Sequence, residues 1–336
     1  MAPQRRPPSG PDVNAPDWVG AQTLMQMVLP EATWLVKGLL NTGVVAIFAS
    51  RPKKGKSWMC LQLGRAVSMG EEFLGMETSQ ADVVYFCLED NRRRLQTRLW
   101  ALSDEAADSL RLVVAAGTLQ TGLIGQIRAH LAEFPATKLV IIDTLQVVRE
   151  ASADYSYSAD YSDLRLFKKL AEEADVCVLL VHHLRKMEDP SDSFTDISGT
   201  TGISGAVDTM MVLKEQGRGS GRFTLTATGR DVEHCAKVVE HADAGWTLVE
   251  SLDDEQIRAQ SVPNCIVEAV RFMEIRGTDW EGSSSELLEE ACLDAPNAAV
   301  LGKWLSQHRH YLSEHGIEYR FHATNSKRVV TLALSK

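Results

Sequence analysis

The tripeptide Gly55-Lys56-Ser57, with its surroundings, constrains the fold of this chain more than any other stretch. Residues 43–48 form a continuous apolar run, which is typical of a buried parallel strand. Residues 58–68 carry apolar side chains at helical spacing. A strand, a loop that ends in Gly-Lys-Ser and a helix, in this order, are the parts of a phosphate-binding loop. The pattern therefore predicts an α/β protein with a nucleotide site.

The loop itself supplies the chemistry for binding phosphate. Its backbone N–H groups and the N-terminal dipole of the following helix attract phosphate oxygens. Lys56 is expected to reach the β- and γ-phosphates, and Ser57 to hold Mg²⁺. The residues predicted to bind the nucleotide are Ser50, Arg51, Pro52, Lys53, Lys54, Gly55, Lys56, Ser57 and Trp58. The alternative is a basic surface turn that Ser57 caps.

One position departs from the usual pattern, G-x-x-x-x-G-K-[ST]. Ser50 stands where that pattern has its first glycine. A serine has less backbone freedom than a glycine, and Pro52 compensates in part because its ring fixes one φ angle.

The composition limits the classes of protein to consider. The 336 residues suit two domains, or one large domain with an appendage, and 44% hydrophobic residues can form a substantial core. No apolar run approaches the roughly 20 residues that span a bilayer. The six cysteines have no metal-ligand spacing and resemble the reduced cysteines of a cytoplasmic protein. The net charge of −10 argues against a surface coated with DNA-binding charge, but it allows a local basic site.

Further apolar runs alternate with helical patterns along the chain. Strand-like runs at 83–88, 138–142 and 176–181 predict a parallel sheet with helices on both faces, and the segment "GRFTLTATGRD" predicts a late strand. In open parallel sheets, ligands bind at the carboxyl ends of the strands. The strand ends carry four polar residues, Ser50, Glu89, Asp143 and His183, which are therefore expected to converge on the nucleotide.

Three of these residues have expected roles in ATP hydrolysis. Asp143 follows four apolar residues, as does the carboxylate that orders Mg²⁺ through water. Glu89 can polarise the attacking water, and His183 can donate a hydrogen bond to the γ-phosphate. The alternatives are a surface acid near a helix start for Glu89, and a satisfied polar strand end for His182-His183.

From about Trp34 to Glu250 the chain resembles the RecA-like ATPase core of RepA-type hexameric replicative helicases of plasmids, phages and mobile elements. The motifs that carry the resemblance are "RPKKGKSW", "YFCLEDNRRRLQTRL", "LVIIDTLQ", "VLLVHHLRK", "ISGTTGISGAVDT" and "TGRDV". In the related DnaB-type ring helicases the first loop position is also commonly not glycine, so Ser50 is compatible with the resemblance.

The resemblance implies a role for each matching residue. Lys56 and Ser57 match the residues for phosphate and Mg²⁺, and Glu89 matches the catalytic carboxylate. Asp143 matches the second acidic motif. His183 stands where this group has a Gln or His that senses the γ-phosphate. The cofactors implied are ATP and Mg²⁺.

The resemblance also implies a ring, expected to be a hexamer. Arg230, in "TGRD", matches an arginine finger that enters the site of the neighbouring subunit. The alternative is a turn arginine that pairs with Asp231.

Two long polar loops, at 149–163 and 185–202, are predicted to be functional. In ring ATPases of this kind these positions face the central channel and grip single-stranded DNA. Arg185 and Lys186 are expected to contact phosphates, and Tyr155 or Tyr157 to stack on bases. Both loops also carry many acidic residues, which keeps a flexible or partner-binding loop as the alternative.

The chain is expected to have four parts. Residues 1–20 form a Pro-rich tail that we expect to be disordered. Residues 21–250 form the ATPase domain and residues 251–261 a charged linker. Residues 262–336, with three helices and a hairpin, resemble a winged-helix domain. Its longest predicted helix, which Gly316 closes, presents Lys303, Gln307 and Arg309 to duplex DNA or to a protein.

These observations predict an ATP-hydrolysing, ring-forming DNA helicase or translocase that acts on single-stranded DNA in replication of a plasmid, phage or mobile element. The alternative is a DNA-dependent ATPase that acts as a nucleotide switch in recombination, repair or partner loading without unwinding. A nucleotide-binding scaffold without hydrolysis is disfavoured by Glu89 and Arg230. The sequence does not separate the first two functions.

Overall fold

The computed structural model describes most of the chain. The described residues are 18–28, 33–149, 157–184, 194–197, 201–217, 219–242, 244–253, 256, 262–323 and 328–335; the side chains of residues 157–160, 201, 202, 204, 323 and 328 lie outside the description. The chain divides into two compact units after Thr33. Within the described residues, no helix has the length and the apolar character needed to cross a membrane.

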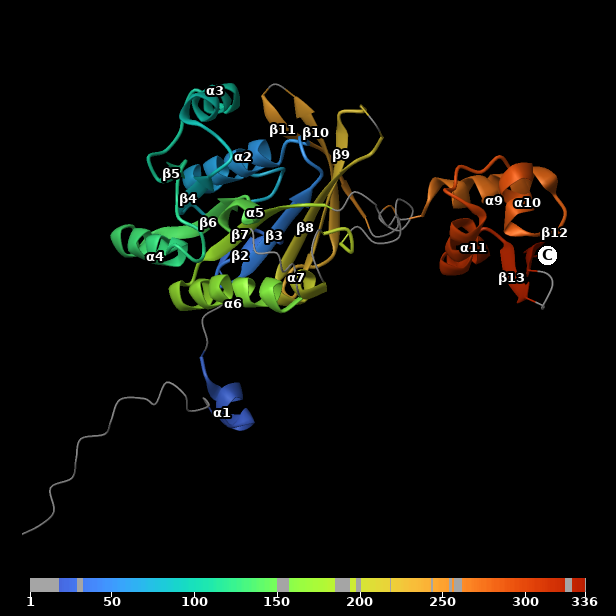
Figure 1. Cartoon of the computed structure of the whole chain (residues 1–336), viewed down its shortest axis with the longest axis horizontal. Coiled ribbons are helices and arrows are strands. Elements are labelled where there is room, and N and C mark those ends of the chain that lie inside the picture. Colours follow the sequence, from blue (N-terminus) through green and yellow to red (C-terminus); the bar gives the residue numbers. More distant parts are fainter. Residues whose placement is uncertain are drawn as a thin grey trace, which may run out of the picture. The chain divides into compact units, whose positions relative to one another are not determined.

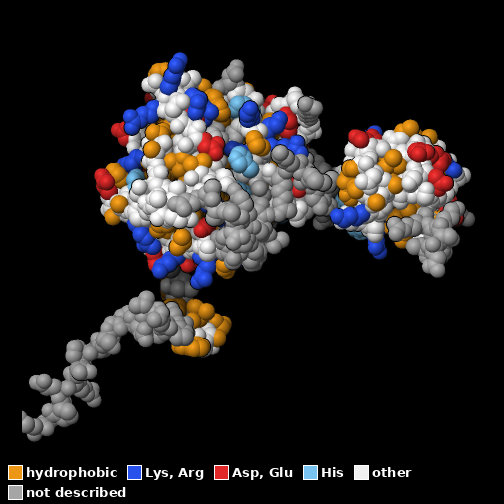
Figure 2. Space-filling model, viewed as in Figure 1, with side chains coloured by type: hydrophobic (Ala, Val, Ile, Leu, Met, Phe, Trp, Pro, Cys, Tyr) orange, Lys and Arg blue, Asp and Glu red, His pale blue; other side chains and the backbone are white. Residues whose placement is uncertain are grey.

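The first unit contains the short helix α1 (Ala21–Gln26), which buries none of its residues. Its neighbourhood is apolar, and Trp18, Met25 and Val28 expose more than four fifths of their surface. Figure 2 shows this apolar character as a group of orange side chains.

The second unit is built around a sheet that has nine strands among the described residues, in the order β11-β10-β9-β8-β3-β7-β6-β4-β5 (Figure 1). The strands are β3 (Val45–Ser50), β4 (Asp82–Cys87), β5 (Leu110–Val113), β6 (Thr137–Asp143), β7 (Cys177–His183), β8 (Thr209–Glu215), β9 (Arg222–Gly229), β10 (Cys235–Ala242) and β11 (Gly245–Leu252). The six strands from β8 to β5 are parallel, which confirms the predicted α/β fold with a mainly parallel sheet.

The other end of the sheet is antiparallel. Strands β9, β10 and β11 follow β8 in antiparallel pairs. Of these, only the strand at β9 was predicted, and the hairpin of β10 and β11 was missed. Strand β11 also runs to Leu252, two residues beyond the predicted domain boundary at 250. A separate small pair joins β1 (Trp34–Val36) to β2 (Leu40–Asn41).

Helices cover both faces of the sheet, as the alternating pattern predicts (Figure 1). One apolar layer joins the sheet to α2 (Lys56–Met69) and α3 (Arg92–Leu102). The other layer joins it to α4 (Leu123–Glu133), α5 (Leu145–Val148), α6 (Tyr157–Ala174) and α7 (Thr201–Ala206). Alternate side chains of β4 show the division, because Val83 and Tyr85 pack in the first layer and Val84 packs in the second.

The parallel register brings the polar strand ends to one edge. Ser50 lies opposite His183, and Asp143 lies opposite Cys87, two residues before Glu89. The first of the two predicted long loops is shorter than expected, because α6 already begins at Tyr157. Arg149 and Asp163, at the two ends of that predicted loop, form an ion pair of 3.0 Å.

Residues 264–334 have a core of their own. Helices α9 (Asn264–Arg276), α10 (Ser284–Glu290), α11 (Ala298–Gln307) and α12 (Arg309–Glu314) pack with a small sheet, β12 (Trp280–Gly282), β14 (Arg328–Leu334) and β13 (Ile317–Ala323), in that order. The expected single helix over 297–316 is wrong. The backbone of His308 leaves the helical region, and the side chain of Arg309 donates to the carbonyl of Ser306, so a new helix starts there.

Candidate nucleotide-binding site

The loop between β3 and α2 has the backbone shape of a phosphate loop. Lys53 and Gly55 both have positive φ, of 62° and 84°, and Gly55 caps the first turn of α2. A Cβ atom on Gly55 would lie 2.7 Å from the ring of Trp246, whose Nε1 donates to the carbonyl of Gly55. Glycine is therefore required at position 55 for its φ angle and for the close approach of β11.

Lys56 is held inside the loop. Its ammonium donates to the carbonyls of Ser50, at 3.0 Å, and Arg51, at 3.1 Å. Burial lowers the pKa of Lys56, and the nearby carboxylate of Asp143 opposes that shift. Ser50 itself is fully buried, so it and Arg51 contribute backbone carbonyls to the site.

Ser57 and Asp143 fit the predicted magnesium site. Asp143 ends β6 and is almost fully buried; burial raises the pKa of its carboxyl, and the nearby hydroxyl of Ser57 opposes that shift. Mg²⁺ takes few protein oxygens and completes its shell with water and nucleotide phosphates. Accordingly, the described residues contain no cluster of three or more His, Cys, Asp or Glu side chains that could hold a metal ion.

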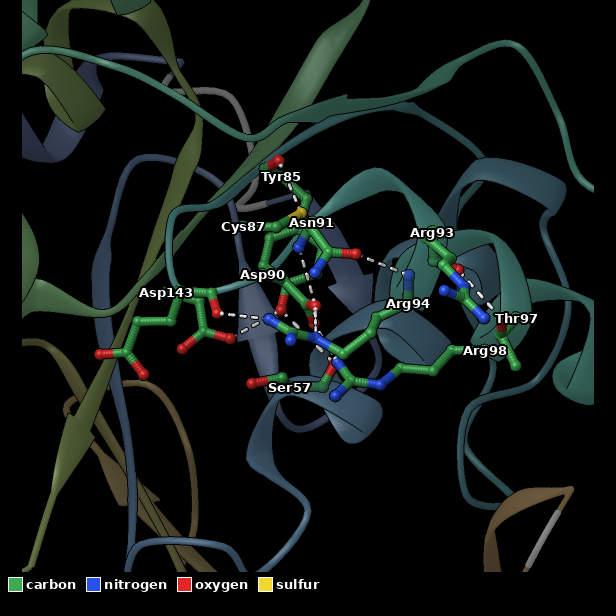
Figure 3. A network of polar contacts seen from close by, with 11 residues as sticks. Ser57, Tyr85, Cys87, Asp90, Asn91, Arg93, Arg94, Thr97, Arg98 and Asp143 are labelled. Atoms are coloured by element: carbon green, nitrogen blue, oxygen red, sulfur yellow. Dashed lines mark hydrogen bonds and ion pairs between the residues drawn. The ribbon is translucent and has the colours of Figure 1, made fainter.

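Of the two adjacent acids after β4, Glu89 is the one that faces the site. Its Oε1 accepts a hydrogen bond of 3.0 Å from the hydroxyl of Thr144. Asp90 is instead held between Arg94, at 2.6 Å, and Arg98 (Figure 3). Because two guanidinium groups occupy the carboxylate of Asp90, the geometry favours Glu89 over Asp90 as the carboxylate that can orient a water molecule and act as general base.

His183 ends β7 next to the phosphate loop. Its Nδ1 lies 3.3 Å from the ammonium of Lys56. Burial lowers the pKa of His183, and the positive charge of Lys56 lowers it further. The ring is therefore neutral at neutral pH and can exchange a hydrogen bond with a phosphate oxygen. The adjacent His182 is 5% exposed and points to the other side of the strand.

These residues line one cavity of about 820 Å³. From the predicted set it includes Pro52, Lys53, Lys54, Gly55, Lys56, Ser57, Trp58, Glu89, Asp143 and His183. The structure thus brings the loop between β3 and α2 together with Ser57, Asp143, the carboxylate of Glu89 and the imidazole of His183.

Residues 11–189 match a protein family described as an AAA domain. The chain belongs to this AAA domain family. Membership implies a nucleoside triphosphatase that typically binds ATP with Mg²⁺, in agreement with the cavity. No curated protein matches the chain.

Among solved structures, the chain resembles a DnaB-like replicative helicase that was studied together with its interactions with primase. The TM-score is 0.51 at 17% identity, over 62% of this chain and 58% of that one. The chain therefore spans less than two thirds of the helicase, and at this identity the likeness concerns the RecA-like fold.

Arg230 does not line the cavity of its own chain. Gly229 pairs with Thr209, and Thr209 pairs with Ala46 at the start of β3, so Arg230 lies at the edge of the sheet opposite the phosphate loop. Its guanidinium is largely exposed and lies 3.4 Å from Asp208. The ion-pair partner is therefore Asp208, and not the Asp231 of the alternative interpretation.

Several residues of the cavity were not predicted from the sequence. They are Arg98, Thr144, Glu215, Gly219, Gly221, Phe223 and His241. A signal existed for Arg98, because Arg94 and Arg98 lie one turn apart on α3 and Asp90 precedes Arg94 by the same four residues, just before the helix. No local signal marks His241, which reaches the site only through the pairing of β10 with β9.

The predicted DNA-binding residues lie mainly outside the described residues. Tyr155, Arg185 and Lys186 are outside, and Tyr157 is described only as the first backbone position of α6. In the C-terminal part, Lys303, Gln307 and Arg309 are exposed, as their predicted role requires.

Proposed function

We propose that this AAA protein is an ATP-hydrolysing, ring-forming DNA helicase or translocase that acts on single-stranded DNA in replication of a plasmid, phage or mobile element. The observation that carries the proposal is that the residues expected to act in catalysis lie at two opposite edges of the sheet. Lys56, Glu89 and His183 converge at one edge of the sheet, and Arg230 lies at the other. The fold of a DnaB-like helicase supports the same function.

The residues of the cavity can perform hydrolysis as follows. The loop amides and Lys56 bind the phosphates, while Ser57 and Asp143 hold Mg²⁺, which neutralises charge on the β- and γ-phosphates. Glu89 orients the attacking water and accepts its proton. His183 contacts the γ-phosphate, and residue 185, where the second polar loop starts, follows it closely in the chain. Loss of the γ-phosphate can thus be communicated to a DNA-binding segment.

Arg230 completes the site of a neighbouring copy. The four residue steps from Ala46 to Ser50 separate the two edges by about 13 Å, further than an arginine side chain extends. In a head-to-tail ring, opposite faces of successive subunits meet. Asp208, which also pairs with Lys168 at 2.9 Å, then supports the exposed guanidinium from behind.

The remaining parts are assigned by the same reasoning. We propose that the ATPase domain runs from Trp34 to the end of β11 at Leu252, and that a linker to residue 261 connects it to a winged-helix-like domain, 262–336, that binds duplex DNA or a protein. Arg185, Lys186 and one of the two tyrosines contact single-stranded DNA in the channel of a hexamer.

The test is strand displacement on a tailed duplex, with ATP hydrolysis followed in parallel. The proposal predicts that single-stranded DNA stimulates hydrolysis and that the duplex is separated only when ATP is hydrolysed. Stimulated hydrolysis without strand separation would identify the alternative, a DNA-dependent ATPase switch. The Glu89→Gln variant, which should bind ATP without turnover, is the matched control for both activities.

A further inference from the structure

A tyrosine hydroxyl lies beneath the magnesium site. Tyr85, in β4, is 1% exposed, and its hydroxyl donates a hydrogen bond of 2.8 Å to Oδ2 of Asp143. The same hydroxyl lies 3.4 Å from the carbonyl of Ser57. Tyr85 does not line the nucleotide cavity, so it can act only through these two residues.

The packing of β4 does not account for this hydroxyl. Tyr85 shares its face of the strand with Val83 and Cys87, and all three belong to the apolar layer beneath α2. An apolar residue of similar size would fill the same space. A hydroxyl is unfavourable in such a layer unless it is hydrogen-bonded, and its one close acceptor in the described structure is the carboxylate of Asp143.

The two oxygens of Asp143 are therefore not equivalent. Oδ2 accepts a hydrogen bond of 2.8 Å from Tyr85, and the hydroxyl of Ser57 lowers the pKa of the same carboxyl. Asp143 lines the cavity, and a carboxylate fixed at one oxygen has lost much of its freedom to rotate, so the hydrogen bond from Tyr85 also fixes the direction of the other oxygen. In many metal sites, a side chain that does not touch the metal donates a hydrogen bond to a metal ligand and so fixes the orientation of that ligand.

We propose that Tyr85 is a positioning residue for Mg²⁺. Its hydroxyl holds Asp143 in the orientation in which that carboxylate and the hydroxyl of Ser57 bind Mg²⁺ or its water. The inference rests on the proposed function of this site in binding ATP with Mg²⁺. It adds that the metal dependence of the site is set by a residue that contacts neither metal nor nucleotide.

The test is the Mg²⁺ dependence of nucleotide binding in the Tyr85→Phe variant of the full chain. A fluorescent ATP analogue is bound first in EDTA and then at increasing Mg²⁺. We expect the Mg²⁺ concentration for half-maximal enhancement of binding to rise roughly tenfold, as for other residues that orient metal ligands. Binding in EDTA should stay unchanged, because the phosphate loop is untouched.

Val83→Ala is the matched control. It removes packing from the same strand and the same face, so it should lower the unfolding temperature and leave the Mg²⁺ dependence as in the wild type. A folded Tyr85→Phe variant with the wild-type Mg²⁺ dependence would overturn the proposal. So would an equal loss of binding with and without Mg²⁺, because that result indicates damage to the whole pocket.

A double-mutant cycle provides a second criterion. With Asp143→Asn as background, Tyr85→Phe should have no further effect on the Mg²⁺ dependence, and additive effects would contradict the proposal. If wild-type binding itself does not respond to Mg²⁺, the proposed function of the site fails and this inference fails with it. If the wild type responds to Mg²⁺ and Tyr85→Phe responds in the same way, the role proposed for Tyr85 is wrong and the proposed function of the site stands.

Discussion

The two edges of the central sheet differ in a way that explains the proposed mechanism. At the carboxyl edge of the parallel strands, Lys56 and Asp143 are buried and held by several hydrogen bonds. At the opposite edge, Arg230 is exposed and has a single ion pair. The first edge is preorganised for phosphate, and the second presents a cation to the outside. This difference is the one expected if, as proposed, a neighbouring chain completes the catalytic site.

The largest effect is expected for Lys56→Ala, because this change removes the cation from the centre of the loop. Binding and hydrolysis of ATP should both be lost, measured by nucleotide fluorescence and phosphate release. Lys54→Ala is the comparison: Lys54 also lines the cavity, but its ammonium pairs with Glu215 at 2.7 Å and not with the loop carbonyls, so its loss should reduce binding less. If both variants lose ATP binding equally, the loop attracts phosphate only through its total positive charge, and Lys56 has no specific role.

Glu89→Gln should leave ATP binding intact and slow hydrolysis by about 10²–10⁴-fold, the range for loss of a positioned general base. The amide can still accept the hydrogen bond from Thr144, so the local structure should be preserved. Single-turnover hydrolysis measures the effect. Normal turnover in this variant would show that Glu89 is not the general base and that another residue orients the attacking water.

At the other edge, Arg230→Ala should slow hydrolysis by about 10³-fold if the guanidinium serves a neighbouring site. ATP affinity should change little. Arg222→Ala is the matched control, because it removes an exposed arginine from the other end of the same strand, where it pairs with Glu240. If both variants hydrolyse ATP at the wild-type rate, the two edges do not cooperate.

A smaller effect is expected for Arg98→Ala. Arg98 pairs with Asp90, lies 5.5 Å from the ring of Trp58, and so fixes the turn that carries Glu89. Its loss should lower kcat roughly tenfold, because one charge-assisted hydrogen bond of about 1.5–3 kcal/mol is removed. Arg98→Lys should restore part of kcat. Arg93→Ala, on the same helix, is the control that should have the wild-type kcat.

The carboxyl edge was largely predictable from sequence. Continuous apolar runs mark the parallel strands, and polar residues directly after them, such as Glu89 and Asp143, mark the edge where ligands bind. Local patterns suffice here because each such strand is buried on both faces.

The antiparallel end was not predictable in the same way. Trp246 is fixed over the phosphate loop by two hydrogen bonds of 2.8 Å with Gln62, which lies 184 residues earlier in the chain. No local pattern reports such a contact. Likewise, the residues around His308 continue a helical pattern, and the break appears only in the structure, where the Arg309 side chain bonds the carbonyl of Ser306.

Mixing two inactive variants tests the shared site most directly. Lys56→Ala keeps Arg230, and Arg230→Ala keeps Lys56, so in random mixed rings about one quarter of the interfaces regain a complete site. ATP hydrolysis is measured for each variant alone and for the equimolar mixture, with assembly of mixed oligomers verified. The account predicts that the mixture recovers a measurable part of the wild-type activity. A mixture that assembles and stays as inactive as its components would contradict the shared site.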